Sequence, residues 1–100
     1  AIFANINTSA LEYAPATSND GLELLFTRAR QNGKAFETSI WITRRKTLDS
    51  AFETPQQISA AVGELAEAAT FSPKGDAIYF HRVVKGKYTL WRAARPAPPR

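Results

Sequence analysis

Apolar residues in this chain come in short blocks, each bounded by residues that favour turns. Residues 22–27 are largely apolar and residues 39–43 are β-branched and aromatic, and both compositions are typical of β-strands. The segments 18–21 and 31–34, one before each block, are turn signals. They favour turns because Asn and Asp side chains bond to their own backbone and Gly adopts positive φ. Two strands joined in this way are most simply an antiparallel hairpin.

The second half of the chain repeats this order of turns and strands. Residues 77–80 and 88–91 are apolar and aromatic, which predicts two further strands. The segments 72–75 and 85–87 each contain Gly, and the first also contains Pro, so both favour turns. The pattern therefore predicts a second antiparallel hairpin and an all-β fold.

Single residues also match between the two halves, which indicates an internal repeat. Because loops tolerate insertions, we assign the change of offset from 54 to 50 to a shorter second hairpin loop. Phe26 and Trp41 are 15 positions apart, whereas Phe80 and Trp91 are 11 positions apart. At an offset of 54, Ser18, Gly21, Phe26 and Arg28 match Ser72, Gly75, Phe80 and Arg82, and at an offset of 50, Trp41 and Arg45 match Trp91 and Arg95.

Residues 59–69 depart from this strand-and-turn pattern. Their Ala, Leu and Glu residues favour a helix, and Ser59 is a suitable N-cap. Gly63 weakens a helix at this point. We therefore expect a short helix or helical turn near 59–69, with a strand as the alternative.

Both halves resemble the WD40-like β-propeller repeat, as found in the propeller domain of TolB-like proteins. The resemblance spans about residues 5–95, although Asn19 stands where the repeat usually has Pro and Lys74 where it usually has Asp. The first copy carries Glu12, Pro15, Ser18, Asp20, Gly21, Phe26, Ile40, Trp41 and Arg45, and the second carries Ser72, Pro73, Gly75, Tyr79, Phe80, Leu90 and Trp91.

The resemblance implies two antiparallel propeller-type blades in a single unit of residues 1–100. The first repeat covers about 12–58 and the second about 67–95, and a Pro-rich tail follows at 96–100. A propeller closes a ring of four to eight blades, so two blades leave faces and edges uncovered. We expect either a fragment of a longer propeller or a homo-oligomer in which several chains complete the ring.

Composition and charge exclude several functions. The net charge is +4, but two of the positive charges, Arg95 and Arg100, lie beside and at the end of the Pro-rich tail. The rest of the chain has one basic run, at 44–46, so nucleic-acid binding is not favoured. No apolar run in these 100 residues is long enough for a membrane helix, and none has the pattern of a signal peptide, so we expect neither here. TolB-like relatives are often periplasmic or extracellular, which slightly favours such a location here.

The residues that could carry chemistry are few. With one His and no Cys, we expect neither a metal site nor a cofactor. His81 matches Thr27 and is interpreted as a surface residue, and Glu64 and Glu67 as a solvated helix face. Glu12 and Glu67 precede their turns at similar points, where we expect them to hold backbone amides. No catalytic residues are therefore predicted.

Trp41 and Trp91 are the main candidate binding residues, because large aromatic side chains make good ligand anchors. Packing between sheets is the alternative role for both. Arg28 and Arg82 match each other in the repeat and complete the candidate set. We expect a non-enzymatic scaffold for a protein or peptide partner, with a subunit or fragment of a propeller hydrolase and a carbohydrate-binding module as alternatives.

Overall fold

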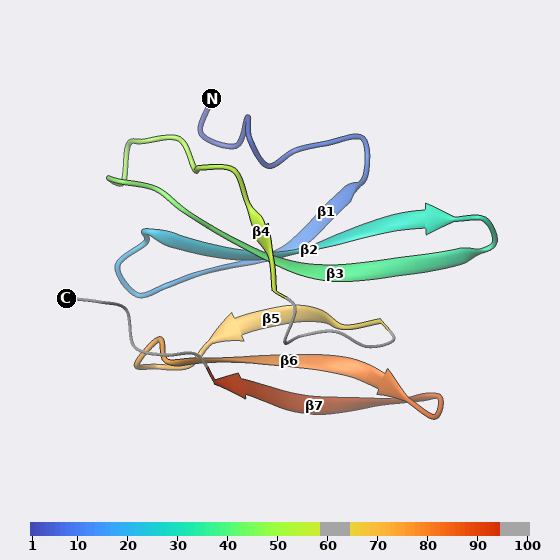
Figure 1. Cartoon of the computed structure of the whole chain (residues 1–100). Helices are drawn as coiled ribbons and strands as arrows, with labels where there is room; N and C mark the ends of the chain where they lie inside the picture. The colour runs from blue at the N-terminus through green and yellow to red at the C-terminus, as the bar shows by residue number, and fades with distance from the viewer. Residues whose placement is uncertain (59–64, 95–100) are drawn as a thin grey trace.

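The computed structural model describes residues 1–58 and 65–94, which form two antiparallel β-sheets stacked on each other (Figure 1). The first sheet has the strand order β1-β2-β3-β4 and the second has the order β5-β6-β7. The strands are β1 (Leu11–Thr17), β2 (Glu23–Asn32), β3 (Ala35–Arg44), β4 (Gln56–Gln57), β5 (Glu67–Phe71), β6 (Ala77–Val84) and β7 (Lys87–Ala94).

The all-β prediction is confirmed for these residues, which contain no helix. The helix expected near 59–69 is wrong at 67–69, since β5 begins at Glu67 and pairs with β6. Ala66 and Ala69 are buried between the sheets, where small side chains let β5 lie close to the first sheet. Tertiary packing therefore overrides the helix propensity of alanine. Residues 59–64 of that prediction, and the predicted tail 96–100, lie outside the described residues.

Both hairpins turn through two residues, so the prediction that the second hairpin has the shorter loop is wrong. Asn32 pairs with Ala35 at one end, and Val84 pairs with Lys87 at the other. The change of offset arises because β2 and β3 extend further beyond the Phe26–Trp41 pair than β6 and β7 extend beyond the matching Phe80–Trp91 pair.

The edge strands β1 and β5 share an irregularity at matching positions. The register of β1 on β2 shifts between Tyr13 and Ala16, and that of β5 on β6 shifts between Glu67 and Thr70. Ala14 and Ala68, 54 positions apart, have φ values of 54° and 58°. A residue with positive φ inside a strand is typical of a β-bulge, which bends the strand and re-aims its side chains.

A turn that contains serine precedes the first strand of each hairpin, β2 in the first sheet and β6 in the second. The Ser18 hydroxyl accepts a hydrogen bond from the Glu23 amide, and the Ser72 hydroxyl accepts one from the Ala77 amide, both at 3.0 Å. Asn19, which departs from the usual proline, donates its side-chain amide to the Pro73 carbonyl at 3.0 Å. The departure from the propeller pattern therefore links the two turns to each other.

The main core lies between the two sheets. Alternate residues of a strand point to opposite faces, and Leu25 and Ile40 of the first sheet face the second. Ile78 and Phe80 of β6 meet them from the other side, together with Ala66 and Ala69. Burial of this apolar surface is what holds the two sheets together.

The opposite face of the first sheet has a smaller core of its own. Leu24 and Phe26 pack there against Ile6 and Phe52, with Trp41 partly buried beside them. The Phe52 amide donates to the Ile2 carbonyl at 3.0 Å, and residues 1–8 lie across this face on the side away from the second sheet (Figure 1). The first sheet is therefore covered on both faces.

Candidate functional site

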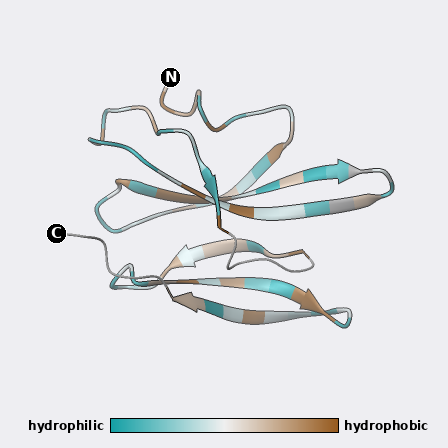
Figure 2. Cartoon of the chain, in the orientation of Figure 1, coloured by the Kyte–Doolittle hydropathy of each residue, from teal (hydrophilic) through white to brown (hydrophobic). Residues whose placement is uncertain are grey.

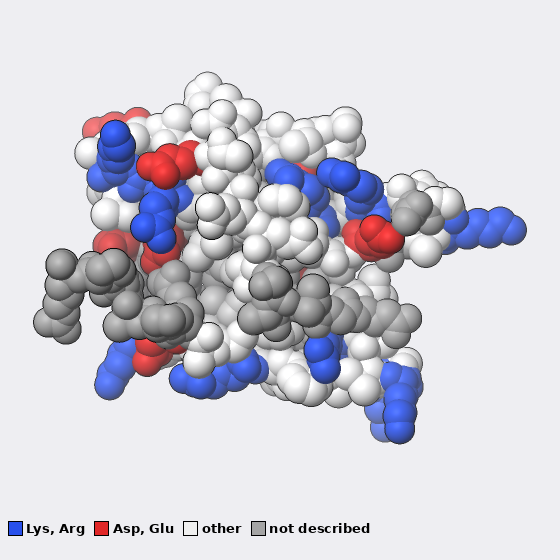
Figure 3. Space-filling view, viewed as in Figure 1, with Lys and Arg blue, Asp and Glu red and all other residues white. Residues whose placement is uncertain are grey.

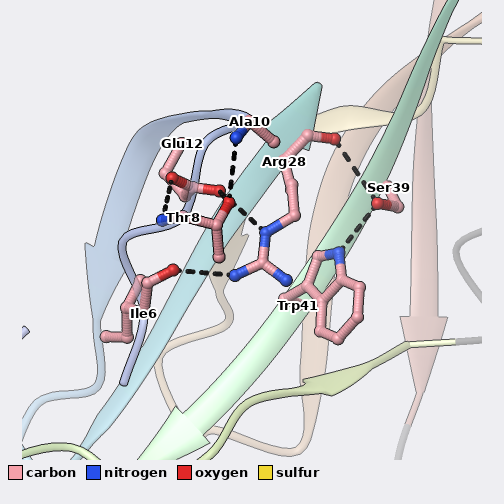
Figure 4. Close-up of polar contacts among 7 residues, drawn as sticks. All are labelled: Ile6, Thr8, Ala10, Glu12, Arg28, Ser39 and Trp41. Carbon is pink, nitrogen blue, oxygen red and sulfur yellow. Dashed lines mark hydrogen bonds and ion pairs between the residues drawn. The ribbon is translucent and has the colours of Figure 1, made fainter. Parts of the chain in front are cut away.

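Arg28 lies at the centre of a polar cluster on the covered outer face of the first sheet (Figure 4). Its Nε donates to a carboxylate oxygen of Glu12 on the neighbouring strand at 2.8 Å, and its terminal nitrogen donates to the Ile6 carbonyl at 2.8 Å. Both charged side chains are only 10% exposed. The guanidinium thus ties the N-terminal segment to β1 and β2.

Trp41 completes the contacts of Arg28. The guanidinium carbon lies 4.5 Å from the centroid of the Trp41 ring, a distance typical of a cation–π contact. The indole Nε1 donates to the Ser39 hydroxyl at 2.7 Å, and Ser39 in turn donates to the Arg28 carbonyl at 3.4 Å (Figure 4). Trp41 is held from both ends, which indicates a packing role for this candidate.

Glu12 holds a backbone amide, as expected, but one upstream of its strand and not one in the turn that follows. Its carboxylate accepts from the Thr8 amide at 3.0 Å and from the Thr8 hydroxyl at 2.7 Å. Partial burial alone would raise the pKa of Glu12, but these bonds and the Arg28 charge outweigh burial and lower that pKa below its ordinary value. Glu12 therefore stays ionised at neutral pH.

The second sheet carries a matching contact. The Arg82 guanidinium carbon lies 3.8 Å from the Trp91 ring centroid, and the Trp91 indole donates to the Thr89 hydroxyl at 2.6 Å. Position 66, which matches Glu12, is an alanine. The four candidate residues therefore form two separate arginine–tryptophan pairs, one on each sheet, and not one shared site.

A second polar cluster joins the two sheets. The Tyr13 hydroxyl of β1 donates to the Glu67 carboxylate of β5, and the other Glu67 oxygen lies 3.1 Å from His81 Nε2. Burial and the Glu67 carboxylate raise the pKa of Tyr13. His81 also makes an edge contact with the Tyr88 ring, at 5.1 Å between centroids.

This cluster corrects one prediction and adds a contact to another. His81 does lie at the surface, with 30% of its side chain exposed, but it is also hydrogen-bonded to Glu67. Glu67 contacts side chains and not turn amides, because it matches Tyr13 at the offset of 54 and not Glu12. The alignment could have shown that Glu67 does not match Glu12, but it could not show that Tyr13, Glu67 and His81 lie together. Glu64 lies outside the described residues.

The outer face of the second sheet is apolar and exposed. Directly paired and alternate strand residues share a face, which places Tyr79, Tyr88 and Leu90 together on the side away from the first sheet. Their exposed fractions are 45%, 65% and 88%. Both hydrophobic and hydrophilic residues occur along β6 and β7 (Figure 2). An open hollow near the end of this face is lined by Glu67, His81, Tyr88, Thr89 and Leu90.

Positive charge is concentrated on the second sheet. Residues 1–58 contain six Lys and Arg and six Asp and Glu, so their charges balance. Residues 65–94 contain five Lys and Arg but only two Asp and Glu. Figure 3 shows mainly basic side chains, with some acidic surface, over the second sheet, and side chains of both signs over the first. The five basic residues of 65–94 are Lys74, Arg82, Lys85, Lys87 and Arg92.

Comparison with known proteins adds no family to this description. No protein-family model matches the chain, and no curated protein matches it. Among residues 1–58 and 65–94, no three His, Cys, Asp or Glu side chains lie together where they could hold a metal ion. The same residues form no helix capable of crossing a membrane.

Proposed function

We propose that this chain is a binding module for a protein or peptide partner, and that the partner binds the outer face of the second sheet. The observation that carries the proposal is a difference between matching positions. Leu25 and Ile40 are fully buried by the second sheet, whereas their counterparts Tyr79 and Leu90 are exposed. These positions are therefore covered in the first sheet and uncovered in the second.

The exposure of three large side chains on one face supports the proposal. Tyr79, Tyr88 and Leu90 are 45%, 65% and 88% exposed, and together they form an apolar patch on the outer face. Such patches mark interaction sites when polar residues surround them. Here Arg92 lies beside Tyr79, and Glu67 and His81 lie beside Leu90. Tyrosine also supplies large contact area at a small entropic cost.

The resemblance to WD40-like propeller repeats belongs to this proposal. Matching bulges, serine turns and arginine–tryptophan contacts at offsets of 54 and 50 support two copies of one repeat. If such repeats stack in series, the exposed face is where the next sheet lies, whether it comes from another domain or from another chain. In either case the partner surface is proteinaceous.

Selection of peptides tests the proposal. Peptides are enriched from a random displayed library on the immobilised protein and then measured against Leu90→Arg. A matched control is Leu48→Arg, since Leu48 is also exposed, at 62%, but lies in the loop after β3. We expect the peptides to bind the wild type and Leu48→Arg alike and to lose at least tenfold in affinity for Leu90→Arg. Equal binding to all three proteins, or no enrichment, would overturn the proposal.

A further inference from the structure

The two sheets differ in one strand. In the first sheet β4 pairs with β3, with Trp41 opposite Gln57 and Ile42 opposite Gln56. The second sheet ends at β7, and no described strand pairs with the outer edge of β7. The positions of β7 that match Trp41 and Ile42 are Trp91 and Arg92. The edge that β4 covers in one sheet is therefore open in the other, as far as residues 65–94 show.

The open edge carries backbone groups in the right register. A two-residue hairpin closes on a hydrogen-bonded pair, here Val84 with Lys87, and such pairs then alternate along the strands. Tyr88, Leu90 and Arg92 consequently direct their amides and carbonyls away from β6. In the first sheet the matching Ile40 carbonyl accepts a hydrogen bond from the Ile58 amide at 2.8 Å.

The side chains that β4 and its flanks contribute indicate what a strand on β7 must carry. Ile58 packs on the core between the sheets beside Ile40 and Ile42. The matching surface on the second sheet is the exposed outer face, at Leu90 and Arg92. An aliphatic residue opposite Leu90 would cover it as Ile58 covers Ile40, and the residue opposite Arg92 lies on the same face.

Charge identifies the partner further. Lys87 and Arg92 both lie on β7, and Lys85 lies in the turn before it. Two β7 edges pairing with each other would place two strands that each carry two cations side by side, which opposes self-association, and charged residues are a common protection of edge strands. An acidic strand would instead be attracted to this edge, because a carboxylate opposite Arg92 forms a favourable cross-strand pair of opposite charges.

We infer that the outer edge of β7 binds an extended acidic peptide by β-strand addition, with a branched aliphatic residue placed over Leu90 and a carboxylate opposite Arg92. Main-chain hydrogen bonds to Leu90 and Arg92 give affinity, and the two side-chain positions give specificity. The inference rests on the proposed function, for which it supplies the partner chemistry and the mode of binding.

The probe is a synthetic peptide with the sequence of residues 51–58 and the change Gln56→Glu, because this segment already pairs with the matching edge of β3. Amide chemical shifts of the isotope-labelled protein are followed during titration. We expect saturable shifts at Tyr88, Leu90 and Arg92, with smaller ones at Ile40 and Ile42. Shifts confined to Ile40 and Ile42, or none at all, would overturn the inference.

Two matched controls separate strand addition from contact by side chains alone. N-methylation of the peptide at its Ile58 amide removes the donor to the Leu90 carbonyl, so we expect at least a tenfold loss of affinity. Arg92→Glu should weaken the acidic peptide and strengthen a Gln56→Lys peptide by a similar factor. If selected library peptides lose binding to Leu90→Arg but ignore N-methylation and Arg92→Glu, the inference is wrong while the proposed function stands.

Discussion

At the residue scale, Arg28 shows how one side chain connects three parts of the first sheet. Its guanidinium contacts Glu12 of β1, the Ile6 carbonyl of the N-terminal segment and the ring of Trp41 on β3. Such a nearly buried charge is tolerated only where hydrogen bonds and an opposite charge replace its water. The cluster is therefore a structural support for the N-terminal segment as well as for the sheet.

Glu12→Gln should lower the free energy of unfolding by about 2 kcal/mol at neutral pH, because it leaves Arg28 buried beside a neutral amide. The folded pKa of Glu12 lies below its ordinary value of 4.5, so the ionised carboxylate stabilises the fold at pH values above 4.5. This stability is lost as pH falls through the folded pKa. Urea denaturation of both proteins between neutral and strongly acidic pH measures the difference, which should shrink toward zero in acid.

The control for this substitution is Arg44→Gln. Arg44 lies 3.7 Å from Glu23, but its side chain is 67% exposed, and exposed pairs contribute little to stability. We expect a change within about 0.5 kcal/mol at every pH. A Glu12→Gln effect that is no larger than that of Arg44→Gln would contradict the role given to the Arg28 cluster.

At the element scale, the two hairpin turns use opposite arrangements of the same two residue types. Gly33 precedes Lys34 and alone has positive φ, which is a type II′ arrangement. Lys85 precedes Gly86, and both have positive φ, at 50° and 79°, which is a type I′ arrangement. Lys85 is thus held in a conformation that a long side chain adopts at a cost.

Lys85→Asn should raise the free energy of unfolding by about 0.5–1 kcal/mol, because Asn tolerates positive φ and Asn-Gly is favoured in type I′ turns. Lys34→Asn removes the same charge from the other turn at a position without positive φ, so it should change stability little. Thermal unfolding of both variants at one salt concentration makes the comparison. Equal shifts in the two would show that charge and not backbone conformation decides the effect.

The strands that could be predicted from sequence are those whose apolar residues and turns are local. The predicted segments 22–27, 39–43, 77–80 and 88–91 fall largely within β2, β3, β6 and β7. The strands β1 and β5 were missed because each is interrupted by a bulge, at Ala14 and Ala68, and β5 is rich in alanine. Their strand conformation depends on pairing and on packing between sheets, which no local pattern reports.

The candidate sites also divide into contacts within one hairpin and contacts between the two sheets. The contacts of Arg28 with Trp41 and of Arg82 with Trp91 each lie within one hairpin, so residues matched by the repeat have similar neighbours in the two sheets. The Tyr13–Glu67–His81 cluster could not be predicted, because it joins two different sheets. Its geometry depends on the β5 bulge and on how the sheets stack.

At the scale of the whole molecule, the two sheets are covered unequally. The first sheet is covered by the second sheet on one face and by residues 1–8 with Phe52 on the other. The second sheet has one face on the core and one face open. Matching positions of the two sheets therefore have different environments, which allows the uncovered state of Leu90 to be tested directly.

Ile40→Ala should lower the free energy of unfolding by about 3 kcal/mol, since it opens a cavity in the core between the sheets. Leu90→Ala, at the matching position, should change it by less than about 0.5 kcal/mol, because the side chain is exposed. Chemical denaturation at several protein concentrations measures both. A large Leu90→Ala effect that grows with concentration would mean that two copies cover this face in solution and that the partner is the chain itself.

The unequal covering also determines how copies of the molecule can aggregate. A particle with one adhesive face can at most pair with another, whereas a particle with two complementary faces adds to itself without end. Residues 1–8 occupy the face that a head-to-tail neighbour would need, and Arg28 fastens them there. Removing residues 1–8 would uncover Leu24 and Phe26 on that face, so we expect the shortened protein to present two adhesive faces and to form filaments.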